Sequence, residues 1–325
     1  MNLKPKNITS LNKNILLTRV TIDSQAYFKI SNSDKMRPFF MSIVSDSNHW
    51  MFISSNGGVT AGRKNAEYAL FPYYSDDKIT ESAEITGAKS IFQVTKNGKK
   101  YIWEPFSIRF QYEYSIQRNV YKSVYGNAII FEEENLDLGL TYRYEWCSSN
   151  TYGFVKKSTL VNNSNESVEI ELVDGIQNVM PFGVSSALQN ASSNLVDAYK
   201  RTELVKETGV GIFALSAIIV DKAEPSEALK ANIAWSLGIN NPTYLLSSLQ
   251  LDTFRKFGKV TQETDVKAEK GAYFINASIQ LDSKDSKDWI IVANVNQDAS
   301  DIVAISKQIK TDDQLLSKVE ANIQL

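Results

Sequence analysis

Large apolar or aromatic residues alternate with polar residues in several stretches of this 325-residue chain. The pattern is clearest over residues 106–114 (FSIRFQYEY), 140–146 (LTYRYEW) and 168–173 (VEIELV). A period of two places every second side chain on one face of an extended strand, so each stretch predicts a half-buried β-strand. Further strands are expected at 15–22, 39–43, 50–54, 90–94, 100–104, 128–132, 157–161, 211–220, 231–237, 273–281 and 289–294. This many short strands, with a hairpin signal at Asn97-Gly98, predicts an all-β protein built as a large sandwich of two antiparallel sheets.

Two segments depart from this pattern. Residues 185–205 carry Leu188, Leu195, Val196 and Tyr199 at helical spacing, which predicts a short helical insertion. From residue 298 onward, apolar residues recur at three- and four-residue steps, which predicts an amphipathic helix whose apolar stripe needs a partner surface. We therefore divide the chain into a β-sandwich domain, residues 1–297, and the start of a helical linker, residues 298–325. The stripe packs either on the sandwich or on a domain that follows.

Composition narrows the range of functions. The formal net charge is −2 and the sequence pI about 5.7, whereas a nucleic-acid-binding face would be clearly basic. The single cysteine, Cys147, cannot form an internal disulfide, which fits a reducing compartment. The first residues lack the apolar run of a signal peptide, and the longest apolar stretch, 210–220, is too short to span a bilayer. We expect a cytoplasmic protein with neither nucleic acid nor membrane as a partner.

No motif for a cofactor or a metal occurs in the sequence. His49 is the only histidine, so a multi-histidine metal site is excluded, and its setting predicts a turn before a strand. We expect no cofactor, no metal and no catalytic residue in this chain. The acidic residues are interpreted as solvated turn and edge groups, because sequence cannot show two carboxylates facing each other across a sugar. These residues are Asp76, Asp77, Glu104, Glu132, Glu133 and Glu134, and Asp174 is read as a turn or cap residue.

Aromatic residues are the most informative side chains. They stand two apart in three sets, so each set lines one face of a strand. Such a face either fills the core, which is the favoured interpretation for any single residue, or offers rings on which sugars stack. The sets are Tyr101/Trp103, Phe110/Tyr112/Tyr114 and Tyr142/Tyr144/Trp146.

Three further segments resemble a known family. The segments 37–40 (RPFF), 50–58 (WMFISSNGG) and 63–66 (RKNA) are similar to the opening of the disaccharide phosphorylases of glycoside hydrolase family 94. The hairpin at 98–105 and the strands at 142–146 and 157–161 extend the resemblance. The chain departs from the family at Phe39, where a tryptophan is usual, and in the charged loop that carries Arg63. Members combine an N-terminal super-sandwich related to galactose mutarotase, a helical linker and an (α/α)6 barrel that carries the catalytic carboxylate.

The resemblance implies that this chain is the non-catalytic sandwich of a glycoside phosphorylase or hydrolase. Its expected partners are an oligosaccharide or disaccharide, the catalytic (α/α)6 barrel of the same polypeptide, and a second copy in a homodimer. The candidate sugar contacts are Trp50, Arg63, Trp103, Tyr112, Trp146, Tyr199, Lys200 and Arg201. The alternatives are a stand-alone carbohydrate-binding module and a mutarotase-like epimerase, which would need His49 as an acid or base. A deep pocket with two opposed carboxyl groups would count against a non-catalytic role.

Overall fold

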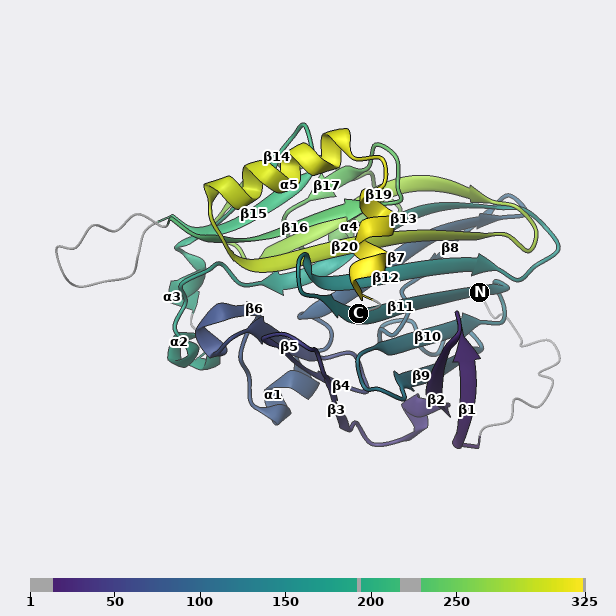
Figure 1. Cartoon of the computed structure of the whole chain (residues 1–325). Coiled ribbons are helices and arrows are strands. Elements are labelled where there is room, and N and C mark those ends of the chain that lie inside the picture. The colour runs from purple at the N-terminus through teal and green to yellow at the C-terminus, as the bar shows by residue number, and fades with distance from the viewer. Residues whose placement is uncertain (1–13, 192–193, 217–228, 324–325) are drawn as a thin grey trace.

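The structure, a computed structural model, describes residues 14–191, 194–216 and 229–323. Every strand pairing within this part of the chain is antiparallel, and the strands form three sheets (Figure 1). The prediction of an all-β antiparallel sandwich is confirmed. Between the strands lie two 3-10 turns, η1 (Ser33–Lys35) and η2 (Ala66–Tyr68), and four short helices, α1 (Asp76–Glu81), α2 (Ser186–Ala191), α3 (Asn194–Asp197) and α4 (Leu251–Arg255).

The largest sheet has eleven strands. Its order is β1 (Leu16–Ile22), β2 (Gln25–Ser31), β9 (Ile116–Ser123), β10 (Ile129–Asn135), β11 (Leu140–Ser149), β12 (Gly153–Asn162), β20 (Ser286–Gln297), β16 (Ala231–Leu237), β15 (Val210–Leu215), β14 (Lys200–Val205) and β18 (Asp265–Lys267). Predicted strands at 231–237, 273–281 and 289–294 lie within β16, β19 and β20, and residues 217–220 of the strand expected at 211–220 lie outside the described part of the chain.

Two smaller sheets oppose the large one. One has the order β17 (Thr243–Leu245), β19 (Gly271–Leu281), β13 (Val168–Val179), β7 (Gly87–Lys96) and β8 (Lys99–Trp103), and the other has the order β3 (Phe40–Ile43), β4 (His49–Ser54), β5 (Val59–Arg63) and β6 (Ala69–Phe71). Side chains from all three sheets share one apolar core, for example Met51, Phe92, Tyr142, Ile170 and Trp289. The sandwich therefore has the single large sheet on one side of the core and the two smaller sheets on the other. Strands β7 and β8 form the hairpin expected at Asn97-Gly98.

The C-terminal helices lie on the other face of the large sheet. Helices α5 (Ala299–Thr311) and α6 (Leu315–Ile323), yellow in Figure 1, confirm the expected helical tail. Asp298 caps α5 by accepting from the backbone N–H groups of Ser300 and Asp301. The buried residues Ile305, Leu315 and Val319 cluster with apolar residues of the large sheet. The apolar stripe of the C-terminal helices thus packs on the sandwich.

The helical insertion is shorter than the sequence pattern suggests. Helices α2 and α3 occupy its first part, but the chain becomes strand β14 at Lys200. Lys200, Thr202 and Leu204 point into the protein while the residues between them are half-buried, which is a period of two. Pairing with β15 and β18 thus overrides the helical spacing further upstream.

The expected strand at 106–114 is wrong, because this segment is a loop without strand pairing. The loop follows β8, which ends at Trp103, and Phe106 has a positive φ of 65°, which an extended strand does not allow. Side-chain bonds hold its two ends: Phe106 N donates to Glu133 Oε2 at 2.6 Å, and the Tyr114 hydroxyl donates to the Ile102 carbonyl at 2.6 Å. Contacts with residues distant in sequence, rather than the local strand propensity, determine the conformation of this segment.

The interpretation of Glu104, Glu132 and Glu133 as solvated groups is also wrong, and Asp174, expected in a turn or at a cap, lies inside β13. Glu104, Glu132, Glu133 and Asp174 are each at most 2% exposed. All four stay buried because each has cationic or hydrogen-bonding partners, as a buried carboxylate requires. Asp76 and Asp77, by contrast, are exposed in the first turn of α1.

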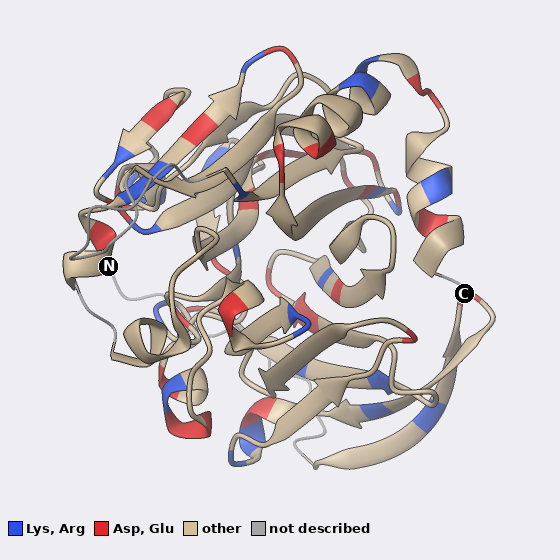
Figure 2. Ribbon diagram, turned by 60° about the vertical axis from the view of Figure 1, so that its left-hand side comes forward, with Lys and Arg blue, Asp and Glu red and all other residues tan. Residues whose placement is uncertain are grey.

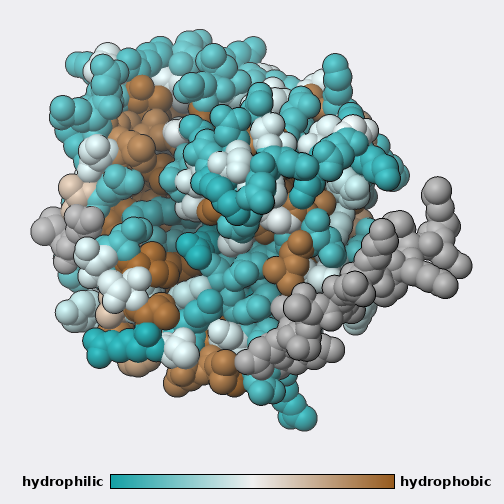
Figure 3. All heavy atoms as spheres, turned by 90° about the vertical axis from the view of Figure 1, so that its right-hand side faces the viewer, coloured by the Kyte–Doolittle hydropathy of each residue, from teal (hydrophilic) through white to brown (hydrophobic). Residues whose placement is uncertain are grey.

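The surface is mixed in charge and in hydropathy. Figure 2 shows basic and acidic residues scattered over the ribbon rather than gathered by sign. On the face seen in Figure 3, apolar side chains form several separate patches among hydrophilic ones. No helix within the described ranges is long and apolar enough to cross a membrane.

Candidate functional site

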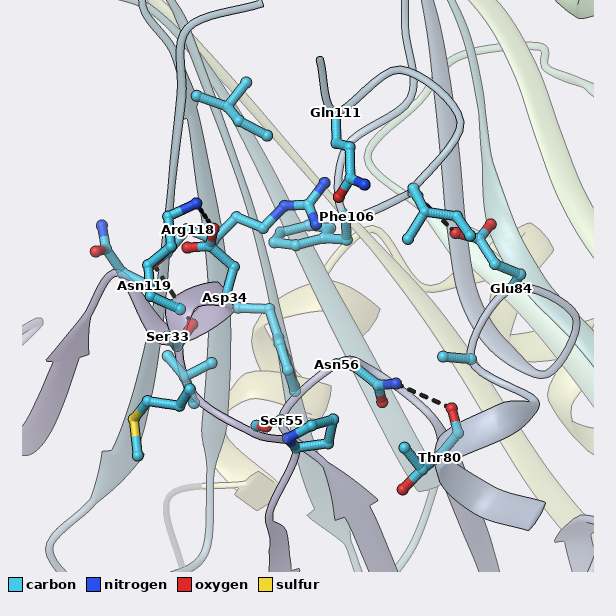
Figure 4. Close-up of a pocket in the computed structure, with 18 of the residues that line it drawn as sticks. Ser33, Asp34, Ser55, Asn56, Thr80, Glu84, Phe106, Gln111, Arg118 and Asn119 are labelled. Atoms are coloured by element: carbon cyan, nitrogen blue, oxygen red, sulfur yellow. Dashed lines mark hydrogen bonds and ion pairs between the residues drawn. The ribbon is translucent and has the colours of Figure 1, made fainter. Parts of the chain in front are cut away.

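A cavity of about 680 Å³ opens where four loops meet the large sheet. Its walls come from the segment around η1, the turn between β4 and β5, the connection from α1 to β7, the loop at 104–115, and strands β9 and β10 (Figure 4). The volume lies in the range of small-molecule sites, which are concave and combine apolar walls with a few polar groups. This cavity is our candidate site.

Aromatic rings line one side of the cavity. Tyr112, in the 104–115 loop, is 92% exposed, so its ring can meet a ligand. Phe106 lies deeper, where its ring packs edge-on against Tyr144 with centroids 5.2 Å apart. One ring is thus presented to solvent and the other is fixed by the core.

Arg118, on β9, supplies a directed donor to the cavity. Its Nε donates to Glu133 Oε2 at 2.7 Å and its Nη2 donates to the Ser107 carbonyl at 2.8 Å. Within the described part of the chain, Nη1 has no protein acceptor, and Figure 4 shows the guanidinium pointing toward Phe106 and Gln111. Because its other nitrogens are held, Arg118 presents this N–H in one orientation.

Glu84 lies across the cavity from Arg118 (Figure 4). Its carboxylate accepts from Lys89 Nζ at 2.6 Å, from Ser107 Oγ at 3.1 Å and from Ile108 N at 2.8 Å. Burial raises the pKa of Glu84, but the charge of Lys89 and these hydrogen bonds outweigh it, so the pKa lies below its usual value. Glu84 is therefore a carboxylate that accepts hydrogen bonds, and it is poorly suited to donate a proton.

The cavity does bring carboxyl groups to opposite sides. Asp34 lines it from the η1 side, where it pairs with Lys35, and Glu84 lines it from the other. A glycosidase pair needs one carboxylic acid with a raised pKa. Because the pKa of Glu84 is lowered, Glu84 does not have the property required of the general acid in such a pair.

Of the eight residues predicted to contact sugar, the structure brings one, Tyr112, to the cavity wall. Trp103 and Trp146 are 1% exposed in the core, and Trp103 Nε1 donates to Glu133 at 2.7 Å. Trp50 lies on β4 away from the cavity, against Gly62 and edge-on to Tyr73.

The four remaining candidates have partners elsewhere. Arg63, at the end of β5, donates to the side chains of Asn48, Asn150 and Asn294. Lys200 pairs with Asp197 and Arg201 with Asp265, while Tyr199 packs with the small apolar cluster beside α3. These residues belong to β5 and to the α3–β14 segment, which do not line the cavity.

His49 does not line the cavity either. It is the first residue of β4, its Nδ1 lies 2.7 Å from Ser47 Oγ, and its ring packs edge-on against Phe154 at 4.9 Å. Burial and then the charge of Arg63 lower its pKa to about 4. His49 is thus a neutral, packed side chain at neutral pH. Within the described ranges, no group of three potential ligands is arranged to hold a metal ion.

The sequence analysis missed most of the residues that line this cavity. Glu84, Phe106, Gln111 and Arg118 belong to segments that meet only in the folded chain. The one usable signal was the polar turn at 54–58, whose Asn56 lines the cavity and donates to the Thr80 carbonyl at 2.9 Å.

Comparisons with known proteins leave the family open. No protein-family model and no curated protein matches the chain, so its membership of glycoside hydrolase family 94 stays a prediction. Similar solved structures include a polysaccharide lyase (10% identity, TM-score 0.45), a bacterial glucoamylase complexed with acarbose (9%, 0.40) and a galactose mutarotase-like protein from Clostridium acetobutylicum (9%, 0.37). The matches cover 84%, 89% and 88% of this chain. The chain spans 34% and 38% of the first two proteins and 100% of the third. At these TM-scores the matches assign neither a family nor an activity.

Proposed function

We propose that this chain binds a neutral saccharide in the cavity and carries out no glycosidic chemistry itself. The observation that carries the proposal is the exposed ring of Tyr112 beside directed polar groups in one concave site. An aromatic ring offers an apolar face for the C–H surface of a pyranose, and sugar hydroxyls need both donors and acceptors. Arg118 Nη1 supplies a donor, Glu84 an acceptor, and the Gln111 amide both (Figure 4).

The charge balance supports a neutral ligand. Three carboxylates line the cavity, Asp34, Glu81 and Glu84, against two cations, Lys35 and Arg118. Arg118 is already neutralised by the buried carboxylate of Glu133. An anionic sugar would therefore enter a site with no excess of positive charge.

The position of His49 argues against a mutarotase-like epimerase. That chemistry needs an acid and a base within hydrogen-bond reach of the sugar ring. The only histidine is neutral, packed against Phe154 and outside the cavity wall. The carboxylate of Glu84 already accepts three protein hydrogen bonds.

We further propose that the sandwich belongs to a longer cytoplasmic enzyme, a glycoside phosphorylase or hydrolase, and supports its (α/α)6 barrel and its dimerisation. This part depends on the resemblance of residues 37–40, 50–58 and 63–66 to the disaccharide phosphorylases. The reading frame beyond Leu325 tests it. A downstream stretch of alternating helices of barrel length is expected, and a stop codon there would contradict it.

A calorimetric titration tests saccharide binding. The probes are methyl glucoside, methyl galactoside, methyl mannoside, cellobiose, maltose and N,N′-diacetylchitobiose. We expect the wild-type chain to bind at least one of them and Tyr112→Ala to weaken that binding roughly three- to tenfold, the range of one aromatic contact. The matched control is Tyr125→Ala, a tyrosine 78% exposed and outside the cavity, which should bind as wild type does.

Two results would contradict the proposal. Equal affinity of Tyr112→Ala and Tyr125→Ala would remove the cavity as the binding site. Turnover of a disaccharide by the isolated chain, with or without phosphate, would contradict the non-catalytic role.

A further inference from the structure

A second, much smaller cavity adjoins the candidate site. Its volume is about 20 Å³, and it shares Asn56, Ala83, Glu84 and Phe106 with the wall of the large cavity. The remaining wall residues are Gly57, Ala88, Lys89, Ser90, Pro105 and Tyr144. The two cavities are thus adjacent and share these four wall residues.

Tyr144 is the unusual residue of this small cavity. It stands on β11 and is 3% exposed, yet its hydroxyl has no hydrogen-bond partner in the part of the chain that the structure describes. A β-carbon built on Gly57 would lie 3.1 Å from this hydroxyl, so the oxygen sits beside Gly57 at the cavity wall. This oxygen is not among the fully buried polar atoms that lack a partner, so it reaches the open space of the small cavity and can form a hydrogen bond with a group placed there.

The ring of Tyr144 cannot turn away from this position. It stacks on Phe131 with centroids 4.9 Å apart and an interplanar angle of 12°, and Phe106 packs edge-on against it at 5.2 Å. Lys156 Nζ lies 5.6 Å from the ring centroid on the core side. The hydroxyl is therefore held toward the cavity by packing on several sides.

Size limits what the small cavity can take. About 20 Å³ accommodates a single oxygen atom with its hydrogen and is far too small for a sugar ring. The charged groups nearby are already paired: Lys89 bonds Glu84 at 2.6 Å and Glu104 at 3.0 Å. The occupant is then a neutral hydroxyl rather than an ion.

We propose that the small cavity is a subsite for one hydroxyl group of the saccharide bound in the large cavity, and that the Tyr144 hydroxyl forms a hydrogen bond with it. The inference rests on the proposed saccharide binding and adds a specificity determinant to it. A site built to hydrogen-bond one hydroxyl discriminates against the analogue that lacks it, because the protein group is then left unpaired. A permanently bound water molecule is the competing occupant.

Titrations with monodeoxy derivatives of the tightest-binding pyranoside from the panel above distinguish a sugar hydroxyl from a permanently bound water molecule as the occupant. For the wild-type chain, we expect one deoxy position to lower the affinity at least about tenfold. Tyr144→Phe should abolish that preference, so that the parent sugar and the same deoxy sugar bind within about twofold of each other. Ala88→Val, which adds two methyl groups to a wall residue of the small cavity and leaves Tyr144 in place, should abolish it as well. Tyr125→Phe is the control and should keep the wild-type profile.

The results distinguish failure of the hydroxyl subsite from failure of saccharide binding itself. If Tyr144→Phe and Ala88→Val bind the pyranoside but keep the wild-type deoxy profile, the small cavity holds water only and the subsite is refuted while saccharide binding stands. If the wild-type chain binds no member of the panel, the proposed function fails and the subsite with it. Thermal unfolding of both variants shows whether a lost preference comes from a folded protein.

Discussion

Replacing Asp174 by Asn tests how the core of the sandwich is held together. Asp174 lies in the middle of β13 and is unexposed, and it faces Lys156 of β12, which is also unexposed. Its two carboxylate oxygens accept six hydrogen bonds at 2.6–3.1 Å, from Ser90, Tyr142, Lys156, Ser158 and Trp289. This network joins strands of the large sheet to β13 and β7 of the opposing sheet.

The substitution keeps the shape of the side chain but removes its charge. The amide nitrogen of Asn cannot accept the bonds that one carboxylate oxygen accepts, and Lys156 loses its counter-ion. Breaking a buried pair by removing one partner costs about 3–5 kcal/mol, because the other charge is left uncompensated. A domain is stable by about 5–15 kcal/mol, so Asp174→Asn should remove a large share of the free energy of unfolding.

The loss should depend on pH in a definite direction. Burial lowers the pKa of Lys156, and Asp174 opposes that effect in the wild-type chain. Without Asp174, we expect Lys156 to be neutral in the folded variant and charged after unfolding. Unfolding then takes up one proton, so the stability of the variant relative to wild type rises with pH by about 1.4 kcal/mol per unit until the unfolded lysine itself titrates, near pH 10.

Urea unfolding followed by tryptophan fluorescence measures both effects, with Asp282→Asn as the matched control because Asp282 is exposed. At pH 7 the control should stay within about 0.5 kcal/mol of wild type. From pH 7 to pH 9 the deficit of Asp174→Asn should shrink by about 2–3 kcal/mol. A variant as stable as the control, or a deficit that does not change with pH, would refute the account in which Lys156 loses its counter-ion and, with it, its proton in the folded variant.

Three further outcomes follow from the same contacts. Val319→Ala truncates an unexposed side chain of α6 and should lower the free energy of unfolding in urea by about 2 kcal/mol. Val303→Ala, at a residue of α5 that is 67% exposed, should lower it by less than about 0.5 kcal/mol. Equal losses would mean that the helices do not pack on the sheet. Glu133→Gln removes the charge that holds Arg118 and the 104–115 loop and should cost about 2–4 kcal/mol, and a neutral result would show that the loop is held by other contacts. The lowered pKa of Glu84 contributes stability that is present above the unfolded pKa of about 4.3 and is lost as the pH falls through the lower folded pKa. Between pH 5 and pH 3, wild type should therefore lose more stability than Glu84→Gln in urea unfolding. Parallel pH profiles of the two proteins would contradict this.

The strands were predictable where local pattern and final pairing agree. Residues 140–146 alternate along β11, and Tyr142, Tyr144 and Trp146 face the core on one side of that strand. The loop at 104–115 shows the limit of this reasoning. Phe110, Tyr112 and Tyr114 alternate as a strand would, but Glu133 and Glu84 anchor the loop at Phe106 and Ile108. The same loop supplies Tyr112, the one predicted sugar contact that lies at the cavity.

Burial of charge was the feature that sequence could not reveal. Asp174 next to Gly175 reads locally as a turn residue, and Glu132 to Glu134 read as a solvated run. Whether such a carboxylate is solvated depends on partners that are distant in sequence. For Asp174 these include Lys156, 18 residues away, and Trp289, 115 residues away. Strand pairing places Lys156 and Trp289 on neighbouring strands of the large sheet, and the packing of that sheet against the one that contains β13 brings both to Asp174.

The amino-acid sequence by itself determined that this chain is a β-sandwich with a helical C-terminal end, because the periods of apolar residues, 2 and about 3.6, are local properties of the chain. Only the tertiary structure decided where the cavity lies and which side chains enter it. Glu84, Phe106 and Arg118 come from different connections and strands, and their positions follow from sheet register, loop anchoring and buried ion pairs. Those interactions join residues far apart in sequence, so no local pattern encodes them.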